Sequence, residues 1–167
     1  MKKKQAALLL ILGLLAGCGA QPKDAAESNS VRYEQVSLYL PNDTADGLVE
    51  QTIQLEQNDP GDPAGVAKDI VQALETAGAL PDGSAAVSAK LDNQRTLSVD
   101  LNRAFAEGIL KSGTAGETMT LASLVDTLWV YYEPSELILT ADGKPVETGH
   151  NIYDEPFTEM YPLESES

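Results

Sequence analysis

The chain has 167 residues, a length that suits one domain plus a tether, and its 26 acidic and 11 basic side chains give a formal net charge of −15 at pH 7. This charge argues against a nucleic-acid partner, because binding phosphates requires basic residues that release counterions. Cys18 is the single cysteine, so an intramolecular disulfide is excluded.

A lipoprotein signal peptide is predicted over residues 1–17. Three lysines at residues 2–4 precede an apolar run, residues 6–16, that is too short to remain as a membrane-spanning helix. The run leads into Leu-Ala-Gly-Cys at residues 15–18. This segment resembles the lipobox of bacterial lipoproteins, in which the cysteine is acylated on sulfur and the chain is cut just before it. We therefore expect lipidation of Cys18 and anchoring to the extracytoplasmic face of the cell membrane, with a plain secretory signal as the alternative.

Cleavage of the signal would make the protein still more acidic. Loss of its three lysines changes the formal net charge from −15 to −18. An acidic body is repelled by an anionic membrane surface, so the lipid would have to hold the protein there. A solvated acidic surface is one explanation of the charge, and basic partners or cations are the other.

One folded domain is predicted over residues 31–160. Residues 18–30, which precede it, are small and polar without apolar periodicity, and are expected to form a flexible tether. Residues 161–167 are expected to form an acidic tail.

Two strands should open the domain. Alternation of apolar and polar residues predicts a half-buried strand over residues 31–40, which Pro41 ends, and a second extended segment is expected at residues 48–56. Residues 42–47 between them form a turn by composition. Their spacing resembles the start of an EF-hand calcium loop, but its twelfth position would be Ile53 rather than a bidentate glutamate, so a solvated turn is preferred.

A helix is predicted over residues 63–77. Asp62 can cap its free amides, and Pro63 at the first helical position loses no hydrogen bond by lacking an N–H. Apolar residues at helical spacing form one face, and Gly78 is a suitable C-terminal stop.

A β-hairpin follows the first helix. Alternation over residues 87–91 and 97–101 predicts its two arms, each with the odd-numbered residues facing inward. One face of this hairpin is therefore apolar and needs a helix over it. Residues 102–110 fit either a short helix or an irregular cover at the end of the sheet.

A second helix is predicted over residues 118–132, after a polar, Gly-rich connection at residues 108–116. Thr118 or Thr120 is its expected cap, and Pro134 ends it. An apolar stripe at helical spacing is expected to form the core. Its members are Leu121, Leu124, Val125, Leu128 and Tyr132.

The end of the domain is predicted to contain one more strand, residues 137–140, and a tight turn at Asp142 and Gly143. From Asp154 onward, acidic residues alternate with aromatic residues and prolines. We expect the beginning of this last segment to pack on the domain.

The order of these elements is similar to that of the GerMN domain, which is named for bacterial sporulation and germination proteins. The resemblance covers about residues 36–157. It is carried by the opening strand at residues 36–41, the hairpin arm and its continuation at 97–105, the helix segment at 121–128, Leu-Ile-Leu at 137–139, Asp-Gly-Lys at 142–144 and Gly-His at 149–150.

The resemblance implies an α+β fold, a single small βαββαβ-type domain with two helices packed on one face of a mixed sheet. This core resembles the ring-building modules of secretion and sporulation machinery, and here it would be carried on an envelope lipoprotein. The resemblance also implies an interaction or assembly factor rather than an enzyme, and it supplies no catalytic residue.

The residues themselves show no evident catalytic constellation. His150 has no cysteine or second histidine with which to share a metal, so a surface or loop-capping role is expected. No serine lies in a Gly-x-Ser-x-Gly motif. Asp100 and Asp126 could form a carboxylate pair only if the second helix laid its polar face on the sheet, and its apolar stripe indicates the opposite. We therefore predict no catalytic residue, metal or cofactor.

The leading prediction is a membrane-anchored interaction or assembly module of the cell envelope, with a role in sporulation or germination implied by the resemblance. Its partners would be the membrane, through the lipid on Cys18, and an envelope protein or a second copy held by weak self-association. An extracytoplasmic binder of a small ligand or cell-wall fragment is the alternative, and an enzyme the third possibility. A binder should show a concave pocket with convergent polar groups. An interaction module should show an exposed apolar or edge-strand surface. An enzyme should show several titratable groups in one cleft.

Overall fold

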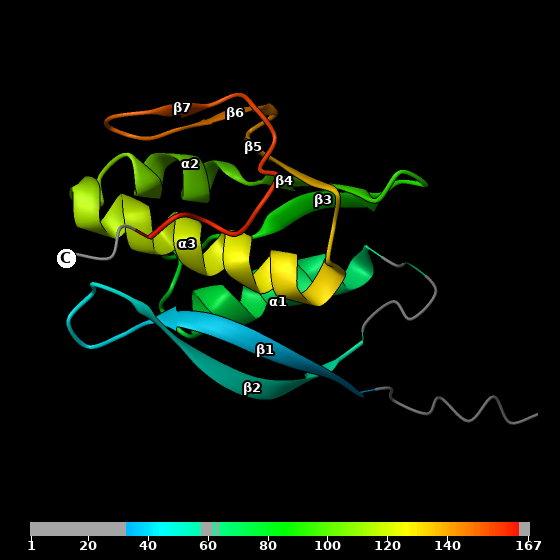
Figure 1. Ribbon diagram of the computed structural model, residues 1–167. Coiled ribbons are helices and arrows are strands. Elements are labelled where there is room, and N and C mark those ends of the chain that lie inside the picture. The colour runs from blue at the N-terminus through cyan, green and yellow to red at the C-terminus, as the bar shows by residue number, and fades with distance from the viewer. Residues whose placement is uncertain (1–32, 58–61, 63, 164–167) are drawn as a thin grey trace, which may run out of the picture. The chain divides into compact units, whose positions relative to one another are not determined.

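The computed structural model describes residues 33–57, 62 and 64–163. The predicted signal peptide, tether and lipidation site lie outside these residues, as do residues 31–32, Pro63 and the end of the acidic tail at residues 164–167. In chain order the elements are β1 (Tyr33–Pro41), β2 (Leu48–Glu56), α1 (Gly65–Thr76), β3 (Ala86–Leu91), β4 (Thr96–Leu101), α2 (Arg103–Ile109), α3 (Gly113–Tyr132), β5 (Glu136–Ala141), β6 (Lys144–Glu147) and β7 (Ile152–Tyr153) (Figure 1).

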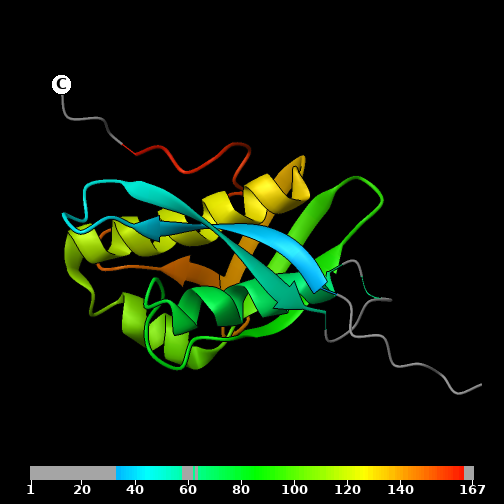
Figure 2. The ribbon, with the colours of Figure 1, turned by 90° about the horizontal axis from the view of Figure 1, so that it is seen from below.

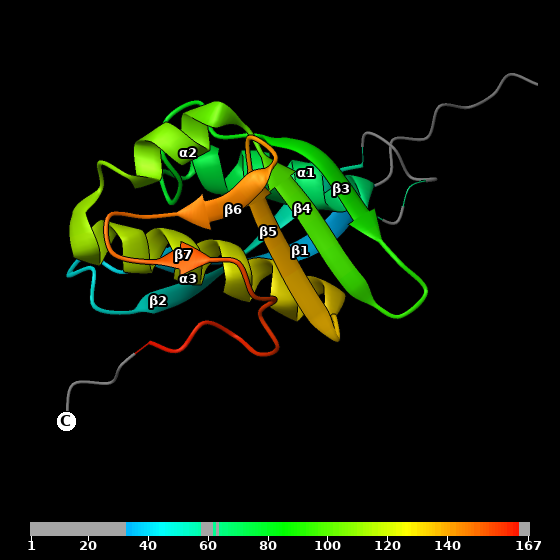
Figure 3. The same ribbon diagram turned by 90° about the horizontal axis from the view of Figure 1, so that it is seen from above.

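Helices α1 and α3 lie between two sheets. Strands β1 and β2 form an antiparallel two-stranded ribbon, and the other five form a mixed sheet in the order β3-β4-β5-β6-β7, in which β4 and β5 are parallel. Figure 1 shows the two helices as a layer between ribbon and sheet, and from below the ribbon crosses over both helices (Figure 2). The opposite side of the domain shows β3, β4 and β5 side by side (Figure 3). The predicted α+β domain is confirmed, and the ribbon adds a second cover to its helices.

Helix α3 is therefore buried on its polar side as well as along its apolar stripe. Five polar residues of α3 are at most 7% exposed: Glu117, Thr120, Ser123, Asp126 and Thr127. Strand β1 packs along the helix, and the Tyr39 amide donates to Thr127 Oγ1 at 3.0 Å. A polar side chain can be buried at low cost only when it is hydrogen-bonded, and this contact satisfies one of the five.

The expected Gly-rich connection before α3 is wrong, because its glycines lie inside helices. Gly108 belongs to α2, and α3 begins at Gly113, so neither Thr118 nor Thr120 caps it. A Cβ at Gly108 would lie 2.3 Å from Pro81 Cβ, a clash that shows why glycine occupies this helical position. Gly113 has a φ of +69°, which allows the chain to turn sharply from α2 into α3.

The boundaries of α1 differ slightly from the prediction. The helix begins at Gly65 with Ala64 as its N-cap, so the prediction that Asp62 caps the helix is wrong. Asp62 instead organises the turn just before the helix by accepting the Ala64 amide at 2.9 Å. Gly78 ends the helix as predicted, with a φ of +77°. The Ala79 amide then donates to the Leu74 carbonyl at 2.9 Å, the long bond of a Schellman motif.

The hairpin β3–β4 is confirmed, with one correction at its first arm. Val87 was expected to face inward, but it is 60% exposed. The register shifts between Ala86 and Ser88, so Val87 sits in a β-bulge that interrupts the inward–outward alternation. The ambiguous segment after the hairpin is helix α2, whose N-cap Asn102 accepts the Phe105 amide at 3.1 Å.

The segment after β7 packs on the domain as predicted. Leu137 and Phe157 exchange two backbone hydrogen bonds of 2.9 Å, and the Tyr161 amide donates to Asp126 Oδ1 at 2.7 Å. The rings of Tyr153 and Phe157 stack with centroids 5.8 Å apart. These contacts tie the C-terminal segment to both β5 and α3.

We predict that Leu124→Ala and Leu128→Ala each lower the free energy of unfolding by about 2–5 kcal/mol, because both side chains are fully buried and truncation leaves a cavity. Chemical denaturation measures the change. Val130→Ala is the control, since Val130 is 39% exposed on the same helix and should cost within about 0.5 kcal/mol. Equal stability of all three variants would contradict the packing of α3.

We also predict a pH-dependent effect at Asp126. Burial raises the pKa of this carboxyl, and the Tyr161 amide offsets the rise only in part. The folded state therefore holds the proton more tightly than the unfolded state, and stability falls as pH rises from the ordinary pKa of 3.8 through the raised value. Asp126→Asn keeps an acceptor oxygen without the charge. The free energy of unfolding of this variant, relative to that of the wild type, should therefore increase as the pH rises over this range.

Asp126→Ala provides the matched comparison for this prediction. It removes the acceptor of the Tyr161 amide and should destabilise the domain by about 1–3 kcal/mol at low pH. Denaturation curves measured between pH 3 and pH 7 separate the two effects. A stability difference between wild type and Asp126→Asn that stays constant with pH would rule out the buried carboxylate.

Candidate interaction surface

His150 ties a loop to helix α3. Its Nδ1 lies 3.0 Å from Glu117 Oε2, and the Gly149 amide donates to Glu117 Oε1 at 2.8 Å. Burial by itself would raise the pKa of Glu117, but hydrogen bonds from His150, Gly149 and Thr148 outweigh it and lower the pKa. The arrangement attaches the β6–β7 loop to the helix, which is the loop-capping type of role expected from the sequence.

Asp100 and Asp126 serve different segments and do not share a hydrogen-bond partner. Asp100 Oδ1 accepts from Thr140 Oγ1 at 2.7 Å and from the Gly143 amide at 3.1 Å, which fixes the β5–β6 turn. Asp126 instead accepts from Tyr161 of the C-terminal segment. The structure therefore uses each carboxylate to hold a turn or segment in place.

The turn at residues 42–47 satisfies its own polar groups. Asp46 Oδ1 accepts from Asn42 Nδ2 and from Thr44 Oγ1, both at 2.7 Å, and these hydrogen bonds lower the pKa of Asp46. Across the described part of the chain, no group of three or more His, Cys, Asp or Glu side chains could hold a metal ion. Of the helices the structure describes, none has the length and apolar character needed to cross a membrane.

Strand β2 has an edge that no other described strand covers. It pairs with β1 over nine residues, with Tyr39 opposite Glu50. The outer edge of β1 faces α3, because the Tyr39 amide donates to Thr127. On the other side of the ribbon, the described residues contain no strand that pairs with β2.

The direction of the Tyr39 amide also fixes which groups of β2 point outward. In an antiparallel pair of strands, two kinds of opposite residues alternate. The residues of one pair exchange both backbone hydrogen bonds, and those of the next pair point their N–H and C=O groups away from the partner strand. Since Tyr39 directs its amide away from β2, its partner Glu50 directs its own groups away from β1. The same then holds for Thr52 and Gln54, which form the free hydrogen-bonding edge.

A groove of about 400 Å³ lies between β2 and α1. We call it the β2–α1 groove. It contains five apolar side chains and five polar ones, three of them with amide or hydroxyl groups and two of them acids. The lining residues are Leu38, Ile53, Leu55, Ala73 and Ala77, then Gln51, Gln72, Thr76, Glu56 and Asp69. Because the side chains of β2 alternate in direction, those at 51, 53 and 55 face the groove while those at 50, 52 and 54 lie on the outer face of the ribbon.

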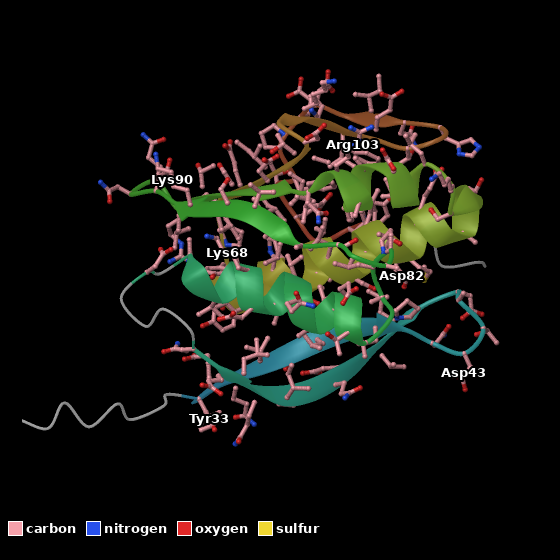
Figure 4. All side chains as sticks on the ribbon, turned by 180° about the vertical axis from the view of Figure 1, so that it is seen from behind. Tyr33, Asp43, Lys68, Asp82, Lys90 and Arg103 are labelled. Atoms are coloured by element: carbon pink, nitrogen blue, oxygen red, sulfur yellow. The ribbon has the colours of Figure 1, made fainter. Side chains whose placement is uncertain are left out.

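The elements around the groove are acidic. Strands β1 and β2 and helix α1 carry the carboxylates of Glu34, Glu50, Glu56, Asp69 and Glu75. The basic side chain on these three elements is Lys68, which Figure 4 shows on α1. A ligand that lies along β2 would therefore meet a negative surface.

The sequence did not indicate this groove. Its apolar side chains come from β1, β2 and α1, and each of these segments reads as an ordinary half-buried element by itself. The available signal was the pair of small residues, Ala73 and Ala77, on a helix face where larger side chains would have filled the space.

Known proteins support the fold and the family. The Germane family, described as sporulation and spore germination, matches residues 37–147, more than half of the chain. The structure is similar to the tandem GerMN domains of the sporulation protein GerM from Bacillus subtilis, with a TM-score of 0.58 and 17% identity. That similarity covers 76% of this chain and 46% of the other, so this chain spans less than half the length of the tandem protein.

Two further solved structures have lower TM-scores. The first GerMN domain of GerM from Bacillus subtilis gives 0.48 with 20% identity over 66% of this chain and 84% of that one. A candidate lipoprotein from Clostridium perfringens gives 0.48 with 17% identity over 76% and 88% of the two chains. No curated protein matches the sequence. The similarity to GerMN domains inferred from the sequence is confirmed, and the chain belongs to the Germane family of sporulation and spore germination.

Proposed function

We propose that this protein is a lipid-anchored interaction module on the extracytoplasmic face of the cell membrane, acting in sporulation or spore germination. The observation that carries the proposal is the free edge of β2 beside the open β2–α1 groove. An uncovered strand edge presents unpaired amides and carbonyls, which readily accept a segment of another protein. The family supports a role in sporulation or germination.

The titratable side chains favour an interaction module over an enzyme. Glu117 holds a loop through His150, and Asp100 and Asp126 each hold a backbone segment. A catalytic site brings several such groups together around a space where a substrate could sit. The β2–α1 groove contains two acids, Glu56 and Asp69, together with amide and apolar side chains.

A small ligand or cell-wall fragment is the second candidate occupant. The groove volume of about 400 Å³ lies within the range of about 300–1,000 Å³ that is typical of small-molecule sites. Such sites enclose most of their ligand, whereas this groove is open along the edge of a strand. An extended polypeptide fits that shape better than a compact solute does.

The anchor would strengthen a weak contact. Lipidation at Cys18 would confine the domain and its envelope partner to one membrane surface, which raises their effective concentration. The Leu-Ala-Gly-Cys segment at residues 15–18 supports this part of the proposal. A partner contact too weak to persist in dilute solution could then form at the membrane.

We predict that Cys18→Ala blocks lipidation and leaves the unprocessed precursor, because the thiol is the acyl acceptor and cleavage follows acylation. Metabolic labelling with a fatty acid and the size of the protein on a gel measure both steps. Cys18→Ser is a second variant, since it keeps a polar group of similar size without the thiol. Normal cleavage and membrane retention of both variants would contradict the lipid anchor.

Photo-crosslinking in intact cells tests the interaction. A crosslinking amino acid replaces Gln51, which lines the groove, or Ile152, which is 62% exposed on β7. We expect a discrete adduct with an envelope protein from at least one position, and its loss in the Cys18→Ala background. The proposed function would be overturned if neither position gave an adduct, or if the adducts consisted of cell-wall fragments.

A further inference from the structure

We propose that the β2 edge binds an extended peptide strand whose residues alternate between apolar and basic side chains. This inference rests on the proposed interaction role and names the chemistry of the partner. The added strand would extend the β1–β2 ribbon by one strand and cover the β2–α1 groove.

The backbone of β2 supplies the hydrogen bonds. The amides and carbonyls of Glu50, Thr52 and Gln54 point away from β1, as the register with Tyr39 requires. In the part of the chain that the structure describes, no backbone hydrogen bond from a turn, loop or cap uses these outward groups. A peptide strand can therefore pair with them without disturbing the bonds that join β2 to β1.

The groove determines one half of the side-chain pattern. Every second side chain of an added strand would point to the same side of the ribbon as Ile53 and Leu55, and so into the groove. Ala73 of α1 and Ala77 at its C-terminal end are small, which leaves space for apolar side chains at these positions. The peptide should thus carry apolar residues at alternate positions.

The outer face of the ribbon determines the other half. Glu50 points to this face from β2, together with Thr52 and Gln54, and all three are exposed. Opposite charges on neighbouring strands attract, and like charges repel. The remaining side chains of the peptide lie on the same face as Glu50, so Lys or Arg fits there and Asp or Glu does not.

The charge on this face also disfavours a second copy of this chain at the edge. If two β2 strands paired with each other, the Glu50 side chains of both copies would lie on the same face of the extended ribbon. Neither β2 nor β1 carries a basic side chain to balance them. The partner is therefore a different polypeptide.

Binding to a designed peptide tests the pattern. The probe is fluorescein-labelled Lys-Val-Lys-Val-Lys-Val-Lys, and its fluorescence anisotropy is measured with the full-length protein in detergent micelles. Glu-Val-Glu-Val-Glu-Val-Glu tests the charge, and Lys-Lys-Val-Val-Val-Lys-Lys tests the alternation at the same composition. We expect the alternating basic peptide to bind at least about tenfold more tightly than either control.

Two pairs of variants locate the site. Gln54→Pro removes an outward amide that β1 does not use, and a proline is tolerated at such an edge position, whereas Gln54→Ala keeps the amide. We expect about a tenfold loss of affinity for Gln54→Pro alone. Glu50→Lys should also weaken binding, while Glu136→Lys makes the same charge change at an exposed position of β5 and should not. Circular dichroism confirms that each variant is folded.

Amide hydrogen exchange gives a readout that needs no variant. The amides of Thr52 and Gln54 should exchange quickly in the free protein and slow down when the peptide is added. The Ile53 amide faces β1 and should change little. Protection at Thr52 that instead increases with protein concentration, without peptide, would mean self-pairing and would overturn the inference.

The remaining outcomes separate this inference from the proposed function. If Gln54→Pro and Gln54→Ala bound the alternating basic peptide equally well, or if the protein bound all three peptides equally well, the β2 edge would not be a strand-binding site. If the crosslinker at Ile152 still captured an envelope protein in cells, the interaction role would stand and only the groove would be excluded.

Discussion

Burial of α3 on both sides is the constraint on which the rest of the domain depends. A helix with one solvent-facing side can leave its polar side chains to water, but α3 lies between the ribbon and the five-stranded sheet. Three of its five buried polar side chains take partners from other parts of the chain. Thr127 accepts from β1, Asp126 from the C-terminal segment, and Glu117 from the β6–β7 loop. Each of these three bonds holds a different segment against the same helix.

The bond from Tyr39 to Thr127 also explains why the two edges of the ribbon differ. It places β1 against α3 and uses an amide that would otherwise be free. Strand β2 is left on the outside, over the small residues of α1. The same packing that buries the helix thus creates both parts of the candidate site, the free edge and the groove under it.

Local patterns in the sequence were sufficient for the elements but not for their environment. Alternation located β1, β3 and β4, and a glycine after α1 and a proline after α3 marked where these helices stop. The second buried side of α3 was not predictable, because Glu117 and Asp126 are acidic residues whose burial depends on the β6–β7 loop and the C-terminal segment, which pack on the helix from distant parts of the chain. Gly108 was likewise predicted to lie in a loop. A glycine is required there because Pro81 approaches closely, and this contact joins segments that are distant in the sequence. The β2–α1 groove could not be predicted either, because its lining residues come from segments that meet only in the folded domain.

The parallel pairing of β4 with β5 has a consequence for the order in which the protein folds. The ribbon β1–β2 and the hairpin β3–β4 each join strands that are close in sequence, so they can form early and independently. Strand β5 can align with β4 only after the whole of α2 and α3 has been brought across the sheet. Pairing over so long a connection carries a large loop-closure entropy and is slow to form. We therefore expect the central β4–β5 ladder to be completed late, when α3 docks and buries its polar side under the ribbon.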